Sequence, residues 1–406
     1  MAEQAKVPAI RFAGFTDPWE QRKLGDVTDS FSGGTPDVSH TSYYGGSIPF
    51  IRSAEINSDK TELFLTEKGL DNSSAKIVER GTVLYALYGA TSGEVGIAAI
   101  KGAINQAILA LSPHTGNDPL FLASWLRREK ARIVDTYLQG GQGNLSGSIV
   151  KELSFALPQQ KEQQVIGSFF SRLDNLITLH QRKYDKLVIF KKSMLEKMFP
   201  KDGESVPEIR FAGFTDPWEQ RKLGDYVVVS TAKNADGRFN KEDVLSVSGE
   251  YGIVNQIAFQ GRSFAGSSVL NYGIVNTGDI VYTKSPLNSN PYGIIKVNKG
   301  IPGIVSTLYA VYRPQDNVHT NFIQVYFEQH ERMNNYMHPL VNKGAKNDMK
   351  VTAENALKGV VTFPSREEQV IISEFFDRLD SLITLHQRKL ELLQNIKKSL
   401  LDKMFA

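Results

Sequence analysis

The stretch "IRFAGFTDPWEQRKLGD" occupies residues 10–26 and occurs again, letter for letter, at residues 209–225. An aromatic-rich repeat of this length, at a far longer spacing than solenoid repeats have, indicates duplication of a whole structural unit. Two more matched pairs follow in the same order: "FFSRLDNLITLHQRK" (169–183) with "FFDRLDSLITLHQRK" (375–389), and "KKSMLEKMF" (191–199) with "KKSLLDKMF" (397–405). The segments between them hardly match. The chain is therefore a tandem duplication in which constant segments alternate with variable blocks.

Length and composition narrow the possible classes of protein. A chain of 406 residues predicts two or three domains, and 41% hydrophobic with 22% charged residues is ordinary for a soluble protein. No apolar run reaches the roughly 20 residues of a membrane helix, and "MAEQAKVPAIRF" lacks the apolar centre of a signal peptide. The absence of cysteine fits a cytoplasmic protein, which we expect. A net charge of +3 does not by itself indicate nucleic-acid binding.

The constant tails at residues 159–200 and 365–406 are predicted to be long helices with a heptad seam, because their apolar residues recur at alternating steps of four and three. The seam of the first helix is Ile166, Phe170, Leu173, Ile177, His180, Tyr184, Leu187, Lys191, Met194 and Met198. The seam of the second is Ile372, Phe376, Leu379, Ile383, His386, Leu390, Leu393, Lys397, Leu400 and Met404. Two such seams in one chain most simply pack on each other.

Local signals support these helices and leave one question open. Pro158 and Pro364 stand just ahead of them, and "SREE" at 365–368 has the pattern of a capping box. The histidine and lysine within each seam either set the register of the helix pair or sense pH or a ligand; the first interpretation is the simpler.

Each variable block is predicted to be mixed α/β. The short repeat is too small to fold alone, and its aromatic residues are expected to anchor each block to a shared scaffold. Strands are predicted at "IPFIRSAEI", "GTVLYALYG", "EVGIAAI" and "INQAILALSP" in the first block, and at "GDIVYTKS", "YGIIKV" and "IVSTLYAVYR" in the second. Helices are predicted at "DPLFLASWLRREKARIVDTYL", opened by Asp118 and Pro119, and at "TNFIQVYFEQHERMNNYM". The two blocks share an order of elements without sharing letters.

Motifs for catalysis are missing or incomplete. The Asn/Asp-Pro-Pro-aromatic loop of amino-methyltransferases is only approached by "DPW" (17–19) and "NPYG" (290–293), and "FAGFT" lacks the last glycine of the methyl-donor loop. The glycine-rich "YGATSGEVG" lacks the Gly-Lys-Ser/Thr of a phosphate-binding P-loop. The scattered histidines do not have metal-ligand spacing, and no nuclease carboxylate cluster or Ser/His/Asp arrangement can be argued. We therefore expect no catalytic residues and no metal site in this chain.

Binding is the remaining function, and the loops of the variable blocks suit DNA. Lysine and arginine neutralise phosphates, while asparagine, glutamine, serine and arginine pair with base edges. The candidate DNA readers are Tyr88, Thr91, Ser92, Gln142, Asn144, Lys284, Asn288, Asn290, Lys343, Lys346 and Asn347, with Arg52, Lys101 and Arg238 as weaker phosphate contacts. Any one of these residues could instead belong to an ordinary turn. The parallel placement of the loops in the two blocks favours recognition.

The repeated "RFAGFTDPWEQRKLGD", each followed by a variable block and then by "LPQQKEQQVIGSFFSRLDNLITLHQRK" or its echo, resembles the specificity subunits of type I restriction–modification systems. The resemblance covers essentially the whole chain and implies a mixed α/β (α+β) fold with pseudo-twofold symmetry. It implies target-recognition domains at residues 1–158 and 201–364, separated by conserved helices at 159–200 and 365–406 that form an antiparallel coiled coil. It also implies that each domain reads one part of a bipartite double-stranded DNA target.

The same resemblance implies which partners carry the chemistry. The methyl donor is expected on modification (methyltransferase) subunits, of which two are expected, and Mg²⁺ and ATP on the partner subunits, including restriction (translocase/endonuclease) subunits. The outer faces of the long helices are expected to dock the modification subunits, although a charged helix face is often only solvated. Half-sites about 34 Å apart would suit two such readers on duplex DNA. The alternative is a two-module adaptor that binds proteins, without DNA specificity.

Overall fold

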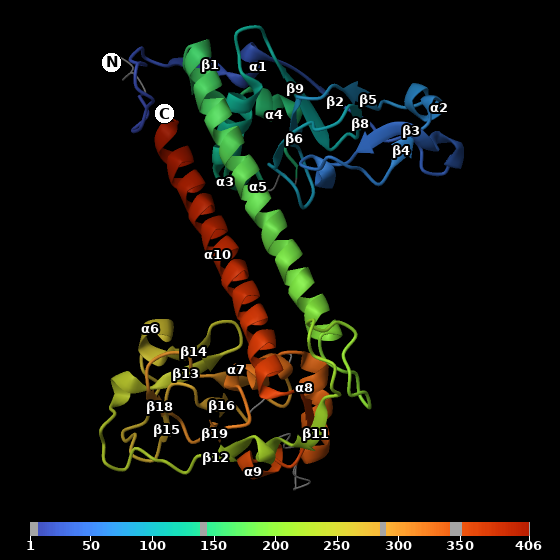
Figure 1. The fold of residues 1–406 in the computed structure, drawn as a ribbon. Helices are drawn as coiled ribbons and strands as arrows, with labels where there is room; N and C mark the ends of the chain where they lie inside the picture. The colour runs from blue at the N-terminus through green and yellow to red at the C-terminus, as the bar shows by residue number, and fades with distance from the viewer. Residues whose placement is uncertain (1–6, 139–143, 285–289, 342–350, 406) are drawn as a thin grey trace. The chain divides into compact units, whose positions relative to one another are not determined.

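The computed structural model describes residues 7–138, 144–284, 290–341 and 351–405. The chain divides into two compact units: unit 1 comprises Met1–Arg182 and Gln387–Ala406, and unit 2 comprises Lys183–His386 (Figure 1). Each unit therefore combines one variable block with parts of both long helices. Within the described ranges, no helix is long and apolar enough to cross a bilayer.

Unit 1 contains ten strands among its described residues. They are β1 (Glu20–Lys23), β2 (Thr28–Ser32), β3 (Tyr44–Ile51), β4 (Phe64–Leu65), β5 (Lys76–Val78), β6 (Val83–Ala86), β7 (Val95–Ile97), β8 (Gly102–Ile104), β9 (Ile108–Pro113) and β10 (Ser154–Leu157). Its helices are α1 (Leu24–Val27), η1 (Thr41–Tyr43), η2 (Ser53–Glu55), α2 (Glu67–Asp71), α3 (Pro119–Leu138), α4 (Gly147–Lys151) and the first part of α5 (Gln160–Lys197).

Unit 2 repeats this order of elements. Its strands are β11 (Glu219–Lys222), β12 (Val227–Val229), β13 (Leu245–Ser248), β14 (Gly252–Asn255), β15 (Gly273–Val275), β16 (Ile280–Tyr282), β17 (Ile295–Val297), β18 (Gly303–Val305), β19 (Ala310–Pro314) and β20 (Val360–Phe363). Its helices are η3 (Leu223–Asp225), η4 (Lys241–Asp243), α6 (Gln256–Gln260), α7 (Thr320–Tyr326), α8 (His330–Met337), η5 (His338–Leu340), α9 (Ala353–Ala356) and the first part of α10 (Arg366–Met404).

The main sheet has the same topology in both units. Its strand order is β2-β9-β6-β7 in unit 1 and β12-β19-β16-β17 in unit 2, and every neighbouring pair is antiparallel. Tyr85 of β6 and Tyr282 of β16 occupy the same place and are both fully buried. The smaller sheet of unit 1, β4-β3-β8-β5, includes the parallel pair β3–β8, and unit 2 keeps a parallel bridge between Val244 and Ile304 at the matching place. The blocks therefore share a fold without sharing a sequence.

Three predicted strands are interrupted or end early in the structure. The segments "INQAILALSP" and "IVSTLYAVYR" are each divided by a turn, because the N–H of Ile108 bonds to the carbonyl of Asn105 and that of Tyr309 to the carbonyl of Ser306. The segment "IPFIRSAEI" ends as a strand at Ile51 and continues as the short helix η2. Propensity did not reveal these ends because the turn residues are flanked by apolar residues on both sides.

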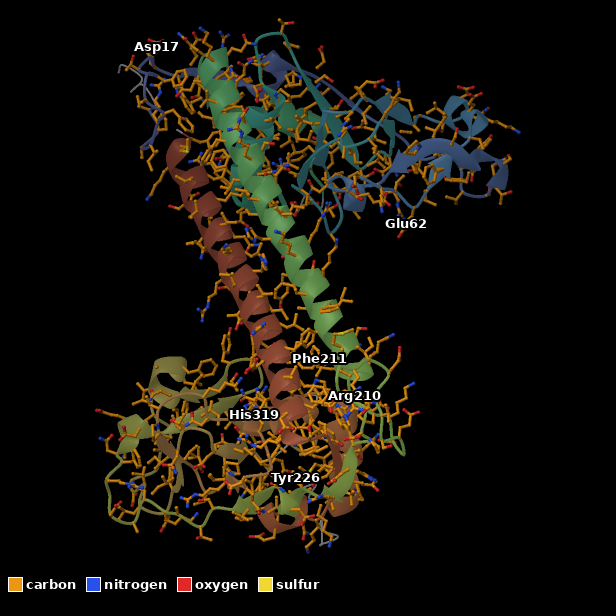
Figure 2. All side chains as sticks on the ribbon, in the orientation of Figure 1. Asp17, Glu62, Arg210, Phe211, Tyr226 and His319 are labelled. Atoms are coloured by element: carbon orange, nitrogen blue, oxygen red, sulfur yellow. The ribbon has the colours of Figure 1, made fainter. Side chains whose placement is uncertain are left out.

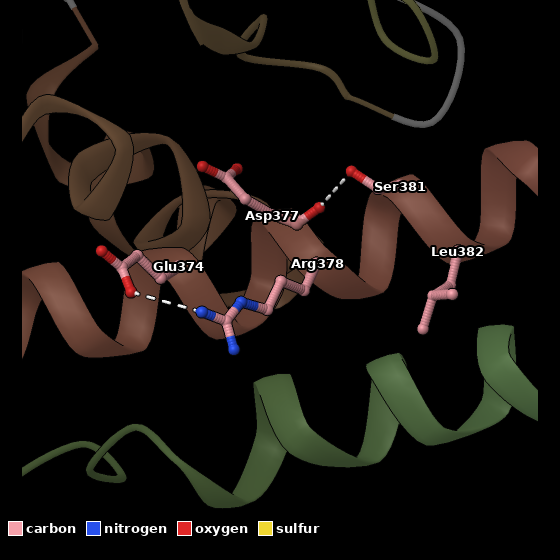
Figure 3. Close-up of a pocket in the computed structure, with 5 residues that line it drawn as sticks. All are labelled: Glu374, Asp377, Arg378, Ser381 and Leu382. Carbon is pink, nitrogen blue, oxygen red and sulfur yellow. Dashed lines mark hydrogen bonds and ion pairs between the residues drawn. The ribbon is translucent and has the colours of Figure 1, made fainter.

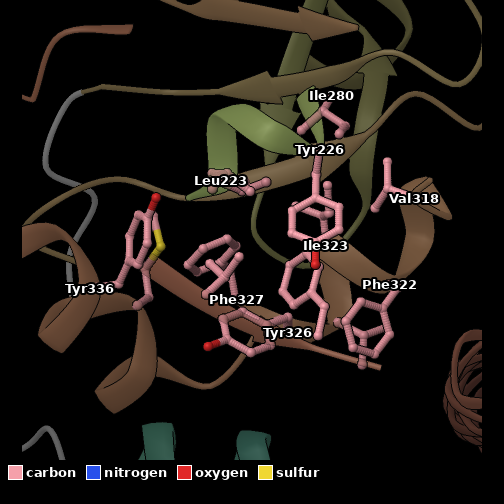
Figure 4. Packing of buried hydrophobic residues seen from close by; sticks show 14 of the residues in the cluster. Leu223, Tyr226, Ile280, Val318, Phe322, Ile323, Tyr326, Phe327 and Tyr336 are labelled. Atoms are coloured by element: carbon pink, nitrogen blue, oxygen red, sulfur yellow. The ribbon is translucent and has the colours of Figure 1, made fainter. Parts of the chain in front are cut away.

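The helix predicted at "TNFIQVYFEQHERMNNYM" is broken into α7 and α8. The break places Phe327 and Tyr336 edge to face, with ring centroids 4.8 Å apart, and leaves both side chains buried. Figure 4 shows these two rings beside Phe322 and Tyr326 in the core of unit 2. The break therefore lets both short helices contribute aromatic side chains to one core.

The constant segments of unit 1 meet in a cluster that we call the hub of unit 1. The ring of Phe405, near the end of α10, lies 6.4 Å from that of Trp19 and 5.9 Å from that of Phe170. Arg11 forms a two-pronged ion pair with the buried Glu162, at 2.6 and 2.7 Å. The first repeat, the start of α5 and the end of α10 are therefore held together.

The hub of unit 2 is built from the equivalent residues. Phe199, just after α5, contacts Trp218 and Phe376 with ring centroids 5.8 and 6.1 Å apart. Arg210 bonds both carboxylate oxygens of Glu368 at 2.7 Å, and Figure 2 shows Arg210 and Phe211 beside α10. Glu368 is thus engaged by Arg210, while Ser365 accepts only a long bond, 3.4 Å, from the N–H of Glu368. Only the serine half of the predicted capping box is therefore formed.

Each hub holds its variable block through the same contacts. The side chain of Gln163 accepts a bond from the N–H of Asp118, at the start of α3, and Gln369 does the same for His319, just before α7, both at 2.9 Å. The edge strands β1 and β11 pair through their backbones with β10 and β20, whose residues belong to the variable blocks. Constant residues therefore support a block largely through backbone groups, which every sequence provides.

The two long helices run antiparallel within each unit. In unit 1, Phe170 and Asp174 of α5 contact Phe405 and Lys397 in reverse order. In unit 2, Lys191 and Phe199, at and just beyond the end of α5, contact Asp380 and Phe376 of α10 in the same reverse order. All the seam residues predicted from the heptad, in both helices, are buried or half-buried. This exposure pattern agrees with a seam, and a continuous coiled coil stays a prediction.

Each seam lysine has an acidic partner in the opposite long helix, and Lys191 has a second one between α7 and α8. Lys191 contacts Asp380 at 2.5 Å and Glu328 at 2.7 Å in unit 2, and Lys397 contacts Asp174 at 2.5 Å in unit 1. Although burial alone would lower it, the two carboxylates raise the pKa of Lys191. Matched ion pairs of this kind favour one alignment of the helices, which supports the register interpretation.

Candidate nucleic-acid interface

The two mid-block loops predicted to read DNA occupy the same place in the two units. Each connects the last two strands of its main sheet, β6 to β7 in unit 1 and β16 to β17 in unit 2. The sequence indicated that the two loops hold matching positions in their blocks, and the shared strand order of the two main sheets explains why. The predicted readers on these two loops therefore belong to equivalent hairpins.

In unit 1 this hairpin is tightly closed. The hydroxyl of Ser92 donates to the carbonyl of Gly89 at 2.9 Å, and Gly89 and Gly93 have φ values of 84° and 78°. Tyr88 and Thr91 are half-buried at the sides of the turn, whereas Gly89 and Ala90 at its tip are exposed. The hydroxyl of Ser92 thus supports the turn itself, and the exposed tip is the part accessible to a ligand.

The second predicted loop of unit 1 comes close to this hairpin. The N–H of Leu145 donates to the carbonyl of Leu87 at 3.0 Å, and Asn144, directly before Leu145, is exposed. The structure therefore brings Asn144 together with Tyr88 and Thr91. Gln142 lies outside the described residues.

In unit 2 two of the predicted readers on this hairpin are described. Lys284 lies two residues after the end of β16, and its Nζ donates to the carbonyl of Thr307 at 3.0 Å. The side-chain oxygen of Asn290 lies 2.5 Å from Nδ1 of His330, which ties the end of the loop to α8. The other predicted readers of unit 2 lie outside the described residues: Asn288, Lys343, Lys346 and Asn347.

The three weaker phosphate-contact candidates lie apart from these loops and have acidic neighbours. Arg52 is paired with Glu55 and Glu62, and Lys101 with Glu79. Burial alone would raise the pKa of Glu55, but the bonds from Arg52 lower it to about 2. Arg238 lies 3.9 Å from Asp236, with its guanidinium over the ring of Phe239. These pairings reduce the positive charge offered to DNA, so these residues are weaker candidates than the loops.

Sequence reasoning missed one residue and two turns next to the loops. The turns at 105–107 and 306–309 separate strands that were predicted to be continuous, and Lys233 follows β12 beside the second of them. The carboxamide oxygen of Asn105 is buried without a partner among the described residues. The Asn-Gln and Ser-Thr pairs within these apolar runs were the available signal.

The described residues contain no group of three or more histidine, aspartate or glutamate side chains that could hold a metal ion. The described surface has pockets on the long helices and on the variable blocks. One, of about 610 Å³, is lined by Phe12, Phe15, Lys161, Gln164, Val165, Ser168, Phe169 and Arg172 of unit 1.

Comparison with known proteins gives consistent similarities. The family described as type I restriction modification DNA specificity domain matches residues 16–188 and 215–395. A type I restriction enzyme MjaIX specificity subunit of Methanocaldococcus jannaschii is 28% identical over 239 residues, which is 54% of this chain and 54% of that relative. A putative MjaX specificity subunit of the same organism is 22% identical over 415 residues, covering 95% of this chain and 92% of the relative. The solved structure of the S subunit from M. genitalium superposes with a TM-score of 0.60 at 15% sequence identity. The superposition covers 99% of each chain, so the two proteins share a fold.

Proposed function

Because this chain belongs to the type I restriction–modification DNA specificity family, we propose that its two variable blocks read the two parts of one split DNA target. The chain is the specificity subunit, a non-catalytic component that directs the system to DNA. The observation that carries the proposal is the duplicated sheet with divergent loops on equivalent hairpins. Two readers with one scaffold and different loops fit a target whose two parts differ in sequence.

The long helices are proposed to act as a spacer between the two readers. The antiparallel contacts inside each unit, the ion pairs of Lys191 and Lys397 and the low exposure of the seam all support a continuous coiled coil. Such a coil would fix the number of base pairs between the two half-sites. We also infer that the protein works in the cytoplasm, where a prokaryotic cell holds its DNA.

The central experiment maps modified adenines in cells that express this chain with its modification subunit. We expect one motif with two specified parts and an unspecified gap. A variant that lacks one heptad from each helix should shorten the gap and keep both specified parts, because the readers are unchanged. A motif without two parts would contradict split-site reading, and an unchanged gap in the variant would contradict the spacer.

We propose that two modification subunits dock on the hubs, one on each. The groove of unit 1 is lined by Phe12, Val165, Phe169 and Arg172. The equivalent residues of unit 2 are Phe211, Ile371, Phe375 and Arg378. Val165 and Ile371 are both 39% exposed. A further pocket on α10, lined by Glu374, Asp377, Arg378, Ser381 and Leu382, lies beside them (Figure 3). The same apolar surface built twice suits two copies of one partner.

Single aspartate substitutions test this docking. Val165→Asp should remove one modification subunit from the complex, Ile371→Asp the other, and the double variant both, because a buried unpaired carboxylate is costly. Native mass spectrometry of the purified complex gives the stoichiometry. Val38→Asp is the matched control, since Val38 is 77% exposed and belongs to the variable block of unit 1. Full occupancy in the double variant would contradict these docking surfaces.

The partner subunits are proposed to carry all the cofactors. The methyl donor would bind the modification subunits, and Mg²⁺ and ATP would bind the partner subunits, including restriction subunits. Specific recognition and chemistry would then be divided between separate chains.

A further inference from the structure

In unit 2, two lysines flank the turn at 306–309. Tyr282 of β16 lies opposite Ala310, so the chain leaves the sheet beside this turn at Lys284. On the other side of β19, Val229 lies opposite Tyr312, and the N–H of Ser230 donates to the carbonyl of Val311. The chain then continues past the same end of the sheet, where Lys233 forms a bridge with Gly273. Both lysines therefore lie at one end of the main sheet, just beyond the two strands, β12 and β16, that pair with β19.

Lys284 is held in a costly conformation. Its φ of 56° makes it the single non-glycine residue with positive φ in the described part of the chain. A side chain in this left-handed region is sterically disfavoured, and strained residues of this kind cluster at functional sites. The bond from its Nζ to Thr307 fixes the ammonium group over the turn at 3.0 Å.

The charges at this place are only partly compensated. Within the described ranges, the ammonium of Lys284 bonds the backbone carbonyl of Thr307, and no ion pair involves Lys284 or Lys233. Burial and the nearby positive charge of Lys233 lower the pKa of Lys284, while Glu354 acts in the opposite direction. Two cations held close together without an ion-pair partner favour binding of an anion.

Unit 1 does not carry these charges. Lys284 follows Tyr282 by two residues, and the residue at the matching distance from Tyr85 is Leu87. Val227 and Thr28 are equivalent, because each lies opposite a proline at the end of the central strand. Counting six residues onward from each leads to Lys233 in unit 2 and to Gly34 in unit 1. The pair is thus a property of the second reader alone.

We propose that Lys233 and Lys284 bind a backbone phosphate of DNA beside the half-site read by unit 2. The inference rests on the proposed function, and it makes the two readers unequal. Unit 2 draws part of its affinity from charge at this position, whereas unit 1 draws none there. The pair lies at the base of the hairpin that carries the predicted readers, so it would set the distance of that hairpin from the duplex.

The salt dependence of binding tests this pair. The whole complex with modification subunits is titrated onto a labelled duplex that contains its mapped target, over 50–200 mM KCl. Each phosphate contact contributes about 0.9 to the slope of log affinity against log salt. The double variant Lys233→Gln/Lys284→Gln should therefore have a slope shallower by about 0.9, with the modified motif unchanged, because phosphate contacts carry no sequence information.

Three controls make the result decisive. Lys233→Arg/Lys284→Arg keeps the charge and should keep the slope, and Lys23→Gln, at a lysine paired with Glu152 in unit 1, should leave it unchanged. Lys284→Gly removes the strain as well as the charge, so it should fold at least as well and still lose slope. Inorganic phosphate at millimolar concentration should compete weakly with the wild type and less with the glutamine variant.

The failure of this inference differs from the failure of the proposed function. An unchanged slope in the glutamine variants, with the target still bound, would overturn the phosphate site alone. An altered motif would show that the lysines read bases, which also overturns it. Absence of target binding by the wild-type complex would instead overturn the proposed function.

Discussion

Replacing residues 27–157 with the corresponding block of another specificity subunit should change one half of the modified DNA sequence and leave the other half unaltered. The replaced block holds the main sheet and hairpin of unit 1, while the hub residues stay in place. The rest of the chain should still read its own half-site, because the block of unit 2 makes separate contacts with its own hub. Sequencing of modified adenines before and after the exchange measures this result.

The exchange should succeed because the contacts between hub and block are generic. The pairing of β1 with β10 is made by the backbone, and all four residues of β1 are exposed. An important side chain that the block supplies is an aromatic residue at the position of Phe121, which lies 5.9 Å from Trp19. Unit 2 keeps it, since Phe322 lies 5.8 Å from Trp218.

The reciprocal exchange is the control for this prediction. Replacing residues 226–363 should change the other half of the motif. If either exchange altered both halves, the two readers would not be independent, and modular reading would be wrong. A block without an aromatic residue at the position of Phe121 should fail to fold, which separates instability from altered reading.

The duplication, the long helices and the mixed α/β blocks could be predicted from the sequence because each leaves a repeated or periodic signal. The heptad steps follow from geometry that acts over a few residues, and α3 begins at Pro119 as the Asp-Pro pair indicates, with Asp118 accepting a bond from the N–H of Phe121. The turns within "INQAILALSP" and "IVSTLYAVYR" left only a weak signal, the polar pairs Asn105-Gln106 and Ser306-Thr307, because apolar residues continue on both sides. Their positions are decided by the packing of the two sheets.

The hubs, and the placement of Lys233 beside the predicted reader Lys284, could not be predicted for a different reason. Both depend on contacts between residues far apart in the chain, such as Phe405 with Trp19 and Lys284 with Thr307. Sequence reasoning did anticipate that Trp19 and Trp218 anchor the blocks. It gave no indication that the partner ring comes from the end of the other repeat, because the sequences that lead to Phe199 and Phe405 are nearly the same.

Truncation of Phe199 should destabilise unit 2 strongly and unit 1 little. The ring of Phe199 is 1% exposed and contacts Trp218, Phe322 and Phe376, with the guanidinium of Arg332 4.6 Å above it. Removal of a fully buried phenylalanine ring costs about 3–5 kcal/mol, because the lost contacts leave a cavity. In Phe199→Ala the amide hydrogens of unit 2 should therefore exchange faster by several orders of magnitude, as hydrogen-exchange mass spectrometry of the whole chain can measure.

The matched variant Phe405→Ala should have the opposite distribution, with faster exchange in unit 1 and protection kept in unit 2. Each phenylalanine ends one long helix yet fills the hub of the unit that begins with the other repeat, so the damage should appear away from the block that precedes it in sequence. Ile189→Ala is the control on α5, since Ile189 is 68% exposed and its truncation should change stability by no more than about 0.5 kcal/mol. Equal loss of protection in both units after either phenylalanine substitution would show that the hubs do not fold separately. It would also remove the physical basis for exchanging one reader at a time.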